Sequence, residues 1–121
     1  MEKFLLTTLL CFCVNAYAVD WEKAHENISG DIYYVDVDNI RRHNGFVYYW
    51  LLTDYLEPLL GDYSHIDKYK VDCGEEKKTR LSRTFYSQPM GKGRITDETT
   101  ERVRYNVLLG MYFVTMSFVC D

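Results

Sequence analysis

Residues 44–55 of this 121-residue chain read NGFVYYWLLTDY, and this stretch decides the fold. Asn44-Gly45 is a strong signal for a two-residue hairpin, because a type I′ turn requires positive φ at both central positions. From Phe46 to Tyr55 the side chains alternate between two faces, and both faces are apolar or aromatic. One face carries Val47, Tyr49 and Leu51, and the other carries Tyr48, Trp50 and Leu52. This pattern is typical of a central strand that is covered on both sides.

Further strands are predicted on either side of this central one. Aromatic residues make up 16% of the chain, which favours pleated, half-buried surfaces over helices. The additional strands are residues 31–36, 64–73 and 79–87, with a short strand at 94–96. The turns that separate them are Glu57-Pro58 with Gly61-Asp62, Gly74 to Lys78, and Gln88 to Gly93. The highly charged stretch from Glu98 to Arg104 is expected to be exposed.

The last apolar run covers residues 107–119 and is interrupted only by Gly110, Thr115 and Ser117. Periodicity alone leaves open whether it is a buried helix or a long strand. As a helix, the run would cover one face of the sheet and leave Cys120 at its end.

Residues 1–18 have the features of an export signal. Lys3 supplies a positive charge, Phe4 to Val14 are apolar apart from two threonines, and Ala16-Tyr17-Ala18 is a small-x-small cleavage site. The apolar stretch is shorter than the roughly 18–20 residues of a membrane span, so no stable membrane anchor is expected. We therefore predict a signal peptide at 1–18, one domain at 19–121, and export to the periplasm or the cell surface, or secretion.

The charge of the chain argues against nucleic acid as a partner. The formal net charge is −4, and an acidic surface repels a phosphate backbone. The basic residues are scattered, apart from Lys77-Lys78 and Arg80, which sit beside Glu75-Glu76.

The residues suggest no coherent catalytic or metal-binding set. Two carboxylate pairs would suit acid–base chemistry, but acidic residues are common at strand ends and turns. These pairs are Asp36 with Asp38 and Asp54 with Glu57. The histidines are too dispersed for a metal motif such as HExxH, and they are His25, His43 and His65. We expect that the protein is not an enzyme and has no metal site.

Two aromatic clusters are the candidate binding residues. They are Tyr33 with Tyr34, and Tyr48, Tyr49 and Trp50. Exposed aromatic side chains suit macromolecular contacts, whereas buried ones are ordinary core, and the sequence leaves both interpretations open.

Several stretches resemble, in their order and spacing, the surface-adhesin protein E family of small exported bacterial proteins. They are Tyr34-Val35-Asp36, Ile40-Arg41-Arg42, residues 50–55, Ser64, Tyr69 to Cys73, residues 86–93 and Cys120. The resemblance implies an α+β fold, in which an antiparallel sheet of about six strands packs with a C-terminal helix at 107–119. It also implies a disulfide between Cys73 and Cys120. A redox pair is usually CxxC and zinc needs four ligands, so a structural disulfide is the favoured role of this pair.

The resemblance also implies a function. The family's better-known member is a lipid-anchored adhesin that binds host matrix proteins and haem. We therefore expect an exported, adhesin-like binding protein whose partner is a host or envelope macromolecule. We expect no cofactor from the residues, and haem is implied by the resemblance alone. The chain departs from that member because Leu10 precedes Cys11 and Phe12 precedes Cys13, which does not make a lipidation site. The alternative is a periplasmic inhibitor of a secreted hydrolase that presents the loop Gln88 to Gly93.

Overall fold

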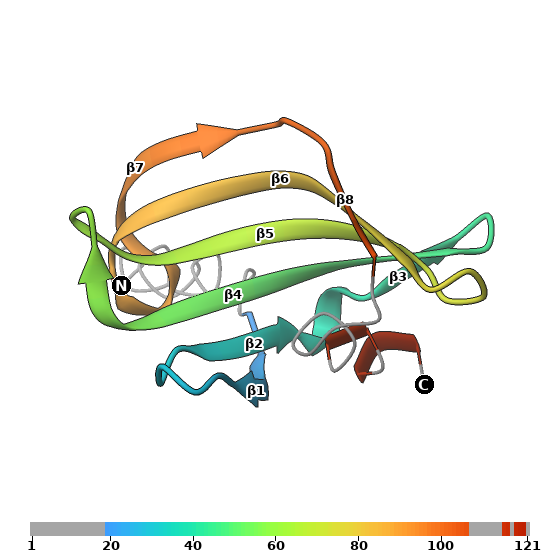
Figure 1. The fold of residues 1–121 in the computed structure, drawn as a ribbon, viewed down its shortest axis with the longest axis horizontal. Coiled ribbons are helices and arrows are strands. Elements are labelled where there is room, and N and C mark those ends of the chain that lie inside the picture. The colour runs from blue at the N-terminus through green and yellow to red at the C-terminus, as the bar shows by residue number, and fades with distance from the viewer. Residues whose placement is uncertain (1–18, 107–114, 117, 121) are drawn as a thin grey trace, which may run out of the picture.

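The computed structural model describes residues 19–106, 115–116 and 118–120, and these form one curved antiparallel sheet (Figure 1). Its eight strands are β1 (Trp21–Glu26), β2 (Ile32–Asp36), β3 (Arg41–His43), β4 (Phe46–Leu59), β5 (Asp62–Asp72), β6 (Lys77–Gln88), β7 (Lys92–Thr99) and β8 (Val103–Asn106). Two short 3-10 turns interrupt the order, η1 (Val37–Asn39) and η2 (Pro89–Gly91).

The three long strands β4, β5 and β6 form the middle of the sheet. The order along the main path is β1-β2-β4-β5-β6-β7. Beside β4, the short strand β3 continues the sheet past the end of β2. In the same way β7 pairs with one end of β6 and β8 with the other. The sides of β4 and β6 that face away from β5 are thus paired with short strands.

The hairpin at Asn44-Gly45 and the central position of the strand after it are confirmed. The expected cover on both sides is incomplete, because Tyr48 and Trp50 are only half-buried. Both turn residues have positive φ, 52° for Asn44 and 82° for Gly45. However, β4 runs to Leu59, so the break predicted at Glu57-Pro58 is wrong. The pairing with β5 shifts register between Asp54 and Leu59, and this irregularity accommodates the proline.

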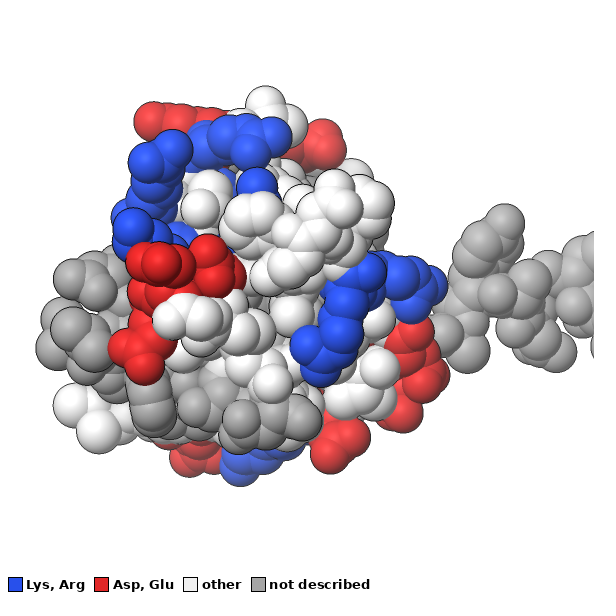
Figure 2. Space-filling view, turned by 90° about the vertical axis from the view of Figure 1, so that its right-hand side faces the viewer, with Lys and Arg blue, Asp and Glu red and all other residues white. Residues whose placement is uncertain are grey.

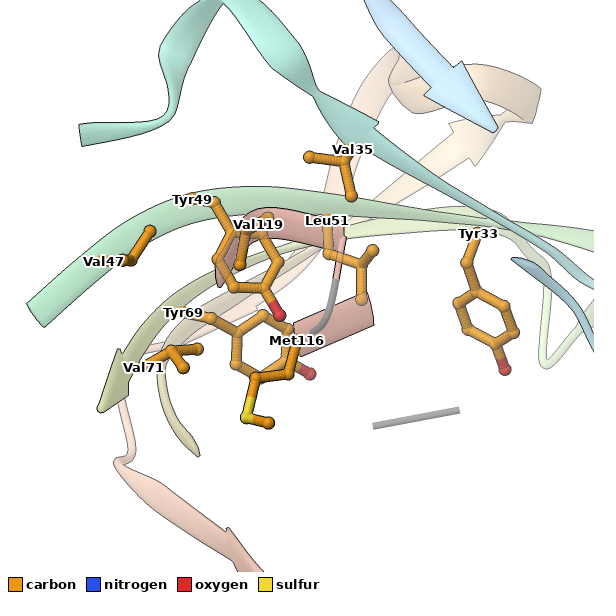
Figure 3. Packing of buried hydrophobic residues seen from close by; sticks show 9 residues of the cluster. All are labelled: Tyr33, Val35, Val47, Tyr49, Leu51, Tyr69, Val71, Met116 and Val119. Atoms are coloured by element: carbon orange, nitrogen blue, oxygen red, sulfur yellow. The ribbon is translucent and has the colours of Figure 1, made fainter. Parts of the chain in front are cut away.

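The core lies on one face of the sheet, which we call the inner face. Buried side chains from β2, β4 and β5 pack there against two residues near the C-terminus (Figure 3). The cluster comprises Tyr33, Val35, Val47, Tyr49, Leu51, Tyr69, Val71, Met116 and Val119. The rings of Tyr49 and Tyr69, which are opposite each other on β4 and β5, stack with centroids 5.6 Å apart. The opposite side of the sheet is called the outer face below.

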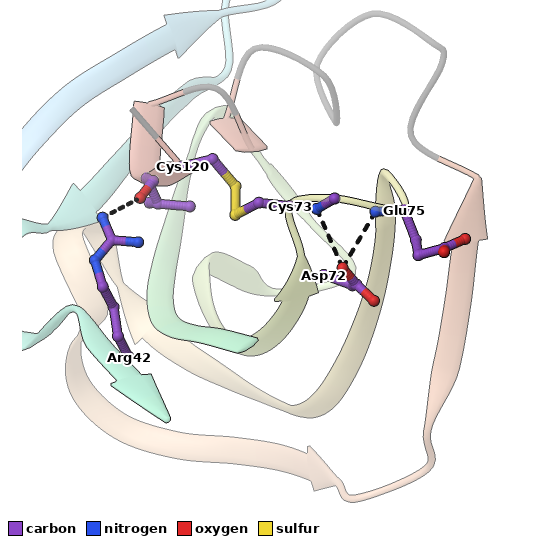
Figure 4. Close-up of a disulfide and its surroundings, with 7 residues drawn as sticks. Arg42, Asp72, Cys73, Glu75 and Cys120 are labelled. Carbon is purple, nitrogen blue, oxygen red and sulfur yellow. Dashed lines mark hydrogen bonds between the residues drawn. A yellow bond between two sulfur atoms is a disulfide. The ribbon is translucent and has the colours of Figure 1, made fainter. Parts of the chain in front are cut away.

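The disulfide between Cys73 and Cys120 is confirmed. It joins the residue after β5 to the helical residues 118–120. Arg42 Nη2 donates a hydrogen bond of 3.2 Å to the carbonyl oxygen of Val119 beside it (Figure 4). These two links hold the C-terminal segment against the sheet.

The predicted fold class is wrong. The sheet has eight strands rather than about six, and helix accounts for little of the described chain, so the fold is not α+β. Most of the helix predicted at 107–119 falls on 107–114 and 117, which lie outside the described residues; residues 115, 116, 118 and 119 are helical. The strands that the sequence did not indicate are β1, β3 and β8. All three are short and polar. They form strands because they pair with a neighbouring strand, and not because of an apolar pattern.

Candidate binding surface on the outer face of the sheet

The structure divides the five predicted aromatic residues between the two faces. Tyr33 and Tyr49 are 9% and 1% exposed and belong to the core. Tyr34, Tyr48 and Trp50 alternate with them along β2 and β4, so they lie on the outer face, where they are half-buried. Of the five predicted aromatic residues, only these three are exposed enough to contact a partner when the domain is folded.

Lysines accompany the outer-face aromatics on the neighbouring strand. Trp50 is opposite Lys68, and Tyr48 is opposite Lys70, in the β4–β5 ladder. Lys68 Nζ lies 5.3 Å from the ring centroid of Trp50, and Lys70 Nζ lies 4.0 Å from that of Phe46. At these distances the ring faces attract the ammonium groups, which holds the lysine side chains along the surface.

A continuous row of residues crosses five strands on this face. Tyr48 is opposite Arg41 on β3 and Lys70 on β5, Lys70 is opposite Thr79 on β6, and Thr79 is opposite Arg104 on β8. We call the line Arg41–Tyr48–Lys70–Thr79–Arg104 the cationic row. Adjacent strands are about 4.8 Å apart, so the backbone positions that carry successive cations in the row are roughly 10 Å apart. The row contains no carboxylate.

Two hollows flank the cationic row. One, of about 340 Å³, is lined by Asn39, Arg41, Tyr48, Tyr49, Trp50 and Lys68. The other, of about 510 Å³, is lined by Phe46, Lys70, Asp72, Glu75, Lys77, Lys78, Thr79, Arg104 and Tyr105. The first hollow brings Tyr48 and Trp50 together with two cations and no acid. The second also holds two carboxylates at its rim.

The charges are segregated on the surface. On the end of the molecule that carries the β5–β6 turn, basic side chains form separate groups, with acidic and uncharged side chains between them (Figure 2). A chain of net charge −4 therefore still presents local positive patches.

A buried ionic network on the inner face was not indicated by the sequence. Asp67 on β5 is 1% exposed and accepts two hydrogen bonds from Arg83, of 2.7 and 2.8 Å. Tyr69 Oη donates to the same carboxylate at 2.9 Å, and His65 Nε2 lies 3.4 Å from it. The other ring nitrogen of His65 is hydrogen-bonded to the hydroxyl of Tyr55. Alternation along β5 places His65, Asp67 and Tyr69 on one face, whereas Arg83 and Tyr55 join them from the neighbouring strands β6 and β4. No local motif predicts these two additions.

The network strongly affects the pKa of its members. Burial alone would raise the pKa of Asp67, but hydrogen bonds and charges from Arg83 and His65 outweigh it and lower the pKa to about 2. Burial raises the pKa of Tyr55 to about 12. Burial also raises the pKa of Tyr69, and the nearby Asp67 charge adds to the effect. Asp67 is thus a fixed anion that organises its neighbours.

Lys78 is a second buried charge on the inner face. It is fully buried, its Nζ donates a 3.0 Å hydrogen bond to Thr115 Oγ1, and it lies 3.9 Å from the ring centroid of Tyr69. Burial lowers the pKa of Lys78 to about 7, against the opposing influence of Asp67.

Two of the four carboxylates considered for acid–base chemistry, Asp36 and Asp54, have structural partners. Asp36 Oδ2 accepts a 2.7 Å hydrogen bond from Asn39 Nδ2. Asp54 Oδ1 accepts a 2.9 Å hydrogen bond from the backbone N–H of Met90 and so holds η2 against the sheet. Gly91 N donates to Ser64 Oγ at 2.9 Å in the same place. The loop at 88–93 is therefore fastened to the sheet.

Metal-ligating side chains are not clustered in the described part of the chain. Over the described ranges, no cluster of three or more metal-ligating side chains occurs. Of the side chains that can hold haem iron, the linings of the two hollows contain tyrosine but no histidine, methionine or cysteine. His65, the buried histidine, is engaged at both ring nitrogens.

The structure thus defines a disulfide-bonded antiparallel sheet that has a core on one face and an aromatic, basic surface on the other. The model of the family described as surface-adhesin protein E matches residues 21–108, and the chain belongs to that family. No curated protein matches the chain.

Solved structures of protein E from Haemophilus influenzae have the same fold. One is 15% identical with a TM-score of 0.68, over 87% of this chain and 89% of the other. A second crystal form is 16% identical with a TM-score of 0.67, over 86% and 89%. Protein E from a non-typeable strain is 16% identical with a TM-score of 0.62, over 88% and 78%.

Proposed function

We propose that this protein is an exported, adhesin-like binding protein that contacts a host or envelope macromolecule through the outer face of its sheet. Membership of the surface-adhesin family supports the adhesin-like part of the proposal. The comparisons do not favour the hydrolase-inhibitor alternative. The protein binds rather than catalyses in this proposal.

One observation carries the choice of surface. Tyr48 and Trp50, the predicted aromatics that reach the outer face of β4, line a hollow together with Arg41 and Lys68. Aromatic and arginine side chains are the residues most enriched at the energetic centres of protein interfaces. A half-buried tryptophan in a hollow already fixed by the sheet loses little conformational freedom on binding.

The proposal includes export by the signal at residues 1–18, with the folded domain acting in the periplasm or at the cell surface. In the described ranges, no helix is both long enough and apolar enough to cross a membrane.

The test is a binding assay with residues 19–121, using a reconstituted basement-membrane matrix as the immobilised target. Trp50→Ala and Tyr48→Ala should each weaken binding at least tenfold, as expected for interface anchors worth about 1.4 kcal/mol or more. Tyr63→Ala is the matched control, because Tyr63 is an exposed aromatic at the start of β5, away from the hollow. Equal binding by all three variants, or no binding by the wild type, would contradict the proposal.

A further inference from the structure

We propose that the cationic row binds an acidic polysaccharide, a sugar chain bearing sulfate or carboxylate groups, laid across the strands of the outer face. The inference rests on the proposed function, because it takes the same face as the binding surface. It adds the chemical class of the ligand and the direction in which it lies.

The first argument is uncompensated charge. Arg41, Lys70 and Arg104 share one row, and among the described residues none of them forms an ion pair. The η1 turn orients Arg41, whose guanidinium donates to Asp38 O at 3.4 Å and Asn39 Oδ1 at 3.3 Å. A guanidinium has five N–H donors, so others are left for an anion. The row is therefore an aligned set of positive charges on an otherwise acidic protein.

The second argument is what separates the charges. In the strand register Tyr48, an aromatic residue, stands between Arg41 and Lys70, and Thr79, a hydroxyl residue, stands between Lys70 and Arg104. A sugar ring offers an apolar C–H face that stacks on an aromatic ring, and hydroxyls that hydrogen-bond to Thr and Tyr. The alternation of cation with ring or hydroxyl therefore suits a ligand that alternates anionic groups with neutral sugar surface.

The spacing argues against nucleic acid. The backbone positions that carry the cations of the row are roughly 10 Å apart, because they lie on every second strand. A nucleic acid strand carries one charge about every 3.4 Å, so most of its phosphates would meet no cation along the row.

The direction of the row argues against a peptide. Extended peptides usually join a sheet by pairing with an edge strand and therefore run parallel to the strands. The cationic row runs across β3, β4, β5, β6 and β8, where the backbone groups are already paired within the sheet.

The position of the exposed apolar side chains argues against a membrane surface. A protein that lies on a membrane inserts apolar side chains next to its basic residues. The exposed leucines here, Leu56, Leu59 and Leu60, are at the β4–β5 turn, at the opposite end of β4 from Arg41 and Tyr48. No large exposed hydrophobic residue of the described chain belongs to the row.

The carboxylates at the edge of the larger hollow limit the path of the ligand. Asp72 and Glu75 line that hollow beside Lys77, and Asp72 Oδ1 is fixed by backbone N–H groups of Gly74 and Glu75 at 3.1 Å. They repel a polyanion from the β5–β6 turn, and this confines it to the line through Lys70 and Arg104.

The experiment measures binding of residues 19–121 to a heparin oligosaccharide by calorimetry at several salt concentrations. Lys70→Gln and Arg104→Gln should each weaken binding about fivefold or more. Each should also make the plot of log affinity against log salt shallower by roughly one unit, because one fewer counterion is released. Lys92→Gln is the matched control, since Lys92 is an exposed lysine on β7 outside the row. Thermal unfolding of each variant checks that the fold is intact.

The outcomes separate this inference from the proposed function. If Trp50→Ala loses matrix binding but the wild type does not bind heparin, the inference of a polysaccharide ligand is overturned. The assignment of the binding surface would then still stand. Heparin binding that Lys70→Gln and Arg104→Gln weaken no more than Lys92→Gln does would also overturn the inference. Equal affinity for polyglutamate or phosphatidylserine vesicles would overturn the ligand class. Heparin binding lost in the row variants but kept in the control, and much weaker binding of desulfated heparin, would establish it.

Discussion

At the scale of single residues, Asp67 is the most consequential charge in the core region. A carboxylate taken out of water is costly unless hydrogen bonds and opposite charge compensate it. Here a two-point contact with Arg83 and the hydroxyl of Tyr69 provide that compensation. The lowered pKa of Asp67 shows that the folded protein stabilises the charged form relative to the unfolded chain.

Asp67→Asn should destabilise the protein by about 3 kcal/mol, because it leaves Arg83 without its partner. The dependence of the free energy of unfolding on acid pH should also change. The folded pKa of about 2 lies below the usual 3.8, so this stabilisation is complete above pH 4 and is lost as the pH falls from about 4 to 2. The loss attributable to Asp67 is about 2 kcal/mol. Denaturant unfolding between pH 7 and pH 2 measures both effects.

The control for Asp67 is Asp38→Asn, an exposed carboxylate that should change the free energy of unfolding by less than about 0.5 kcal/mol. Similar stability of the two variants at pH 7 would show that the network contributes nothing.

The lowered pKa of Lys78 gives a prediction for the stability of the protein at alkaline pH. Its pKa falls from 10.5 to about 7 on folding, so above pH 7 the unfolded chain binds more protons. Stability should therefore rise with pH, by about 2 kcal/mol between pH 7 and 9. In Lys78→Met this rise should disappear, whereas the exposed neighbour variant Lys77→Met should keep it. A flat wild-type profile over this range would disprove the prediction.

The residue scale also shows what the sequence could reveal about the site. Alternation along β4 correctly separates Tyr49 from Tyr48 and Trp50. It cannot tell which face is the core, because both faces are aromatic, and the answer depends on where Met116 and Val119 pack. The partners Arg41, Lys68 and Lys70 are adjacent to the aromatics only through strand register, which no local pattern encodes.

At the scale of elements, the interior strands could be predicted and the edges could not. The predicted strands 46–55, 64–73 and 79–87 correspond to β4, β5 and β6, which have recognisable apolar alternation or sharp turns. Strand β1 reads Trp-Glu-Lys-Ala-His-Glu, and such polar segments become strands only because β2 offers unpaired backbone groups. Charge on edge strands also protects a sheet from joining another sheet.

The short turn η2 gives a prediction at this scale, because Gly91 has φ of +67° and packs closely on β5. A Cβ added there would lie 2.7 Å from Ile66 Cδ1, whereas one added at Gly45, with φ of +82°, would meet nothing within 4 Å. Both alanine substitutions cost roughly 1 kcal/mol in backbone strain. Gly91→Ala should cost about 1 kcal/mol more because the Ile66 side chain must shift. Thermal unfolding compares them, and an equal loss would show that η2 can move away freely.

At the scale of the whole molecule, the fold separates stability from recognition. The inner face carries the core, the disulfide and the buried ionic network, whereas the outer face carries half-buried aromatics and lysines that the core does not need. Substitutions of these half-buried aromatics and lysines can therefore change binding with little effect on stability. This separation is what makes the proposed surface testable by single substitutions.

The boundary between the export signal and the folded domain gives the last prediction. Residues 1–18 are predicted as the signal, and β1 begins at Trp21, only two residues after the expected cut. Val19 is 49% exposed, and Asp20 O accepts a 3.1 Å hydrogen bond from Val37 N, so the sheet needs the chain from about residue 20 onward. Cleavage before Val19 would therefore leave every strand intact. Intact mass and N-terminal sequencing of protein recovered from its native host should show residues 19–121 with both cysteines protected from alkylation until reduction. A mature chain that retains Phe4 to Val14, or one that starts beyond Trp21, would disprove this maturation site.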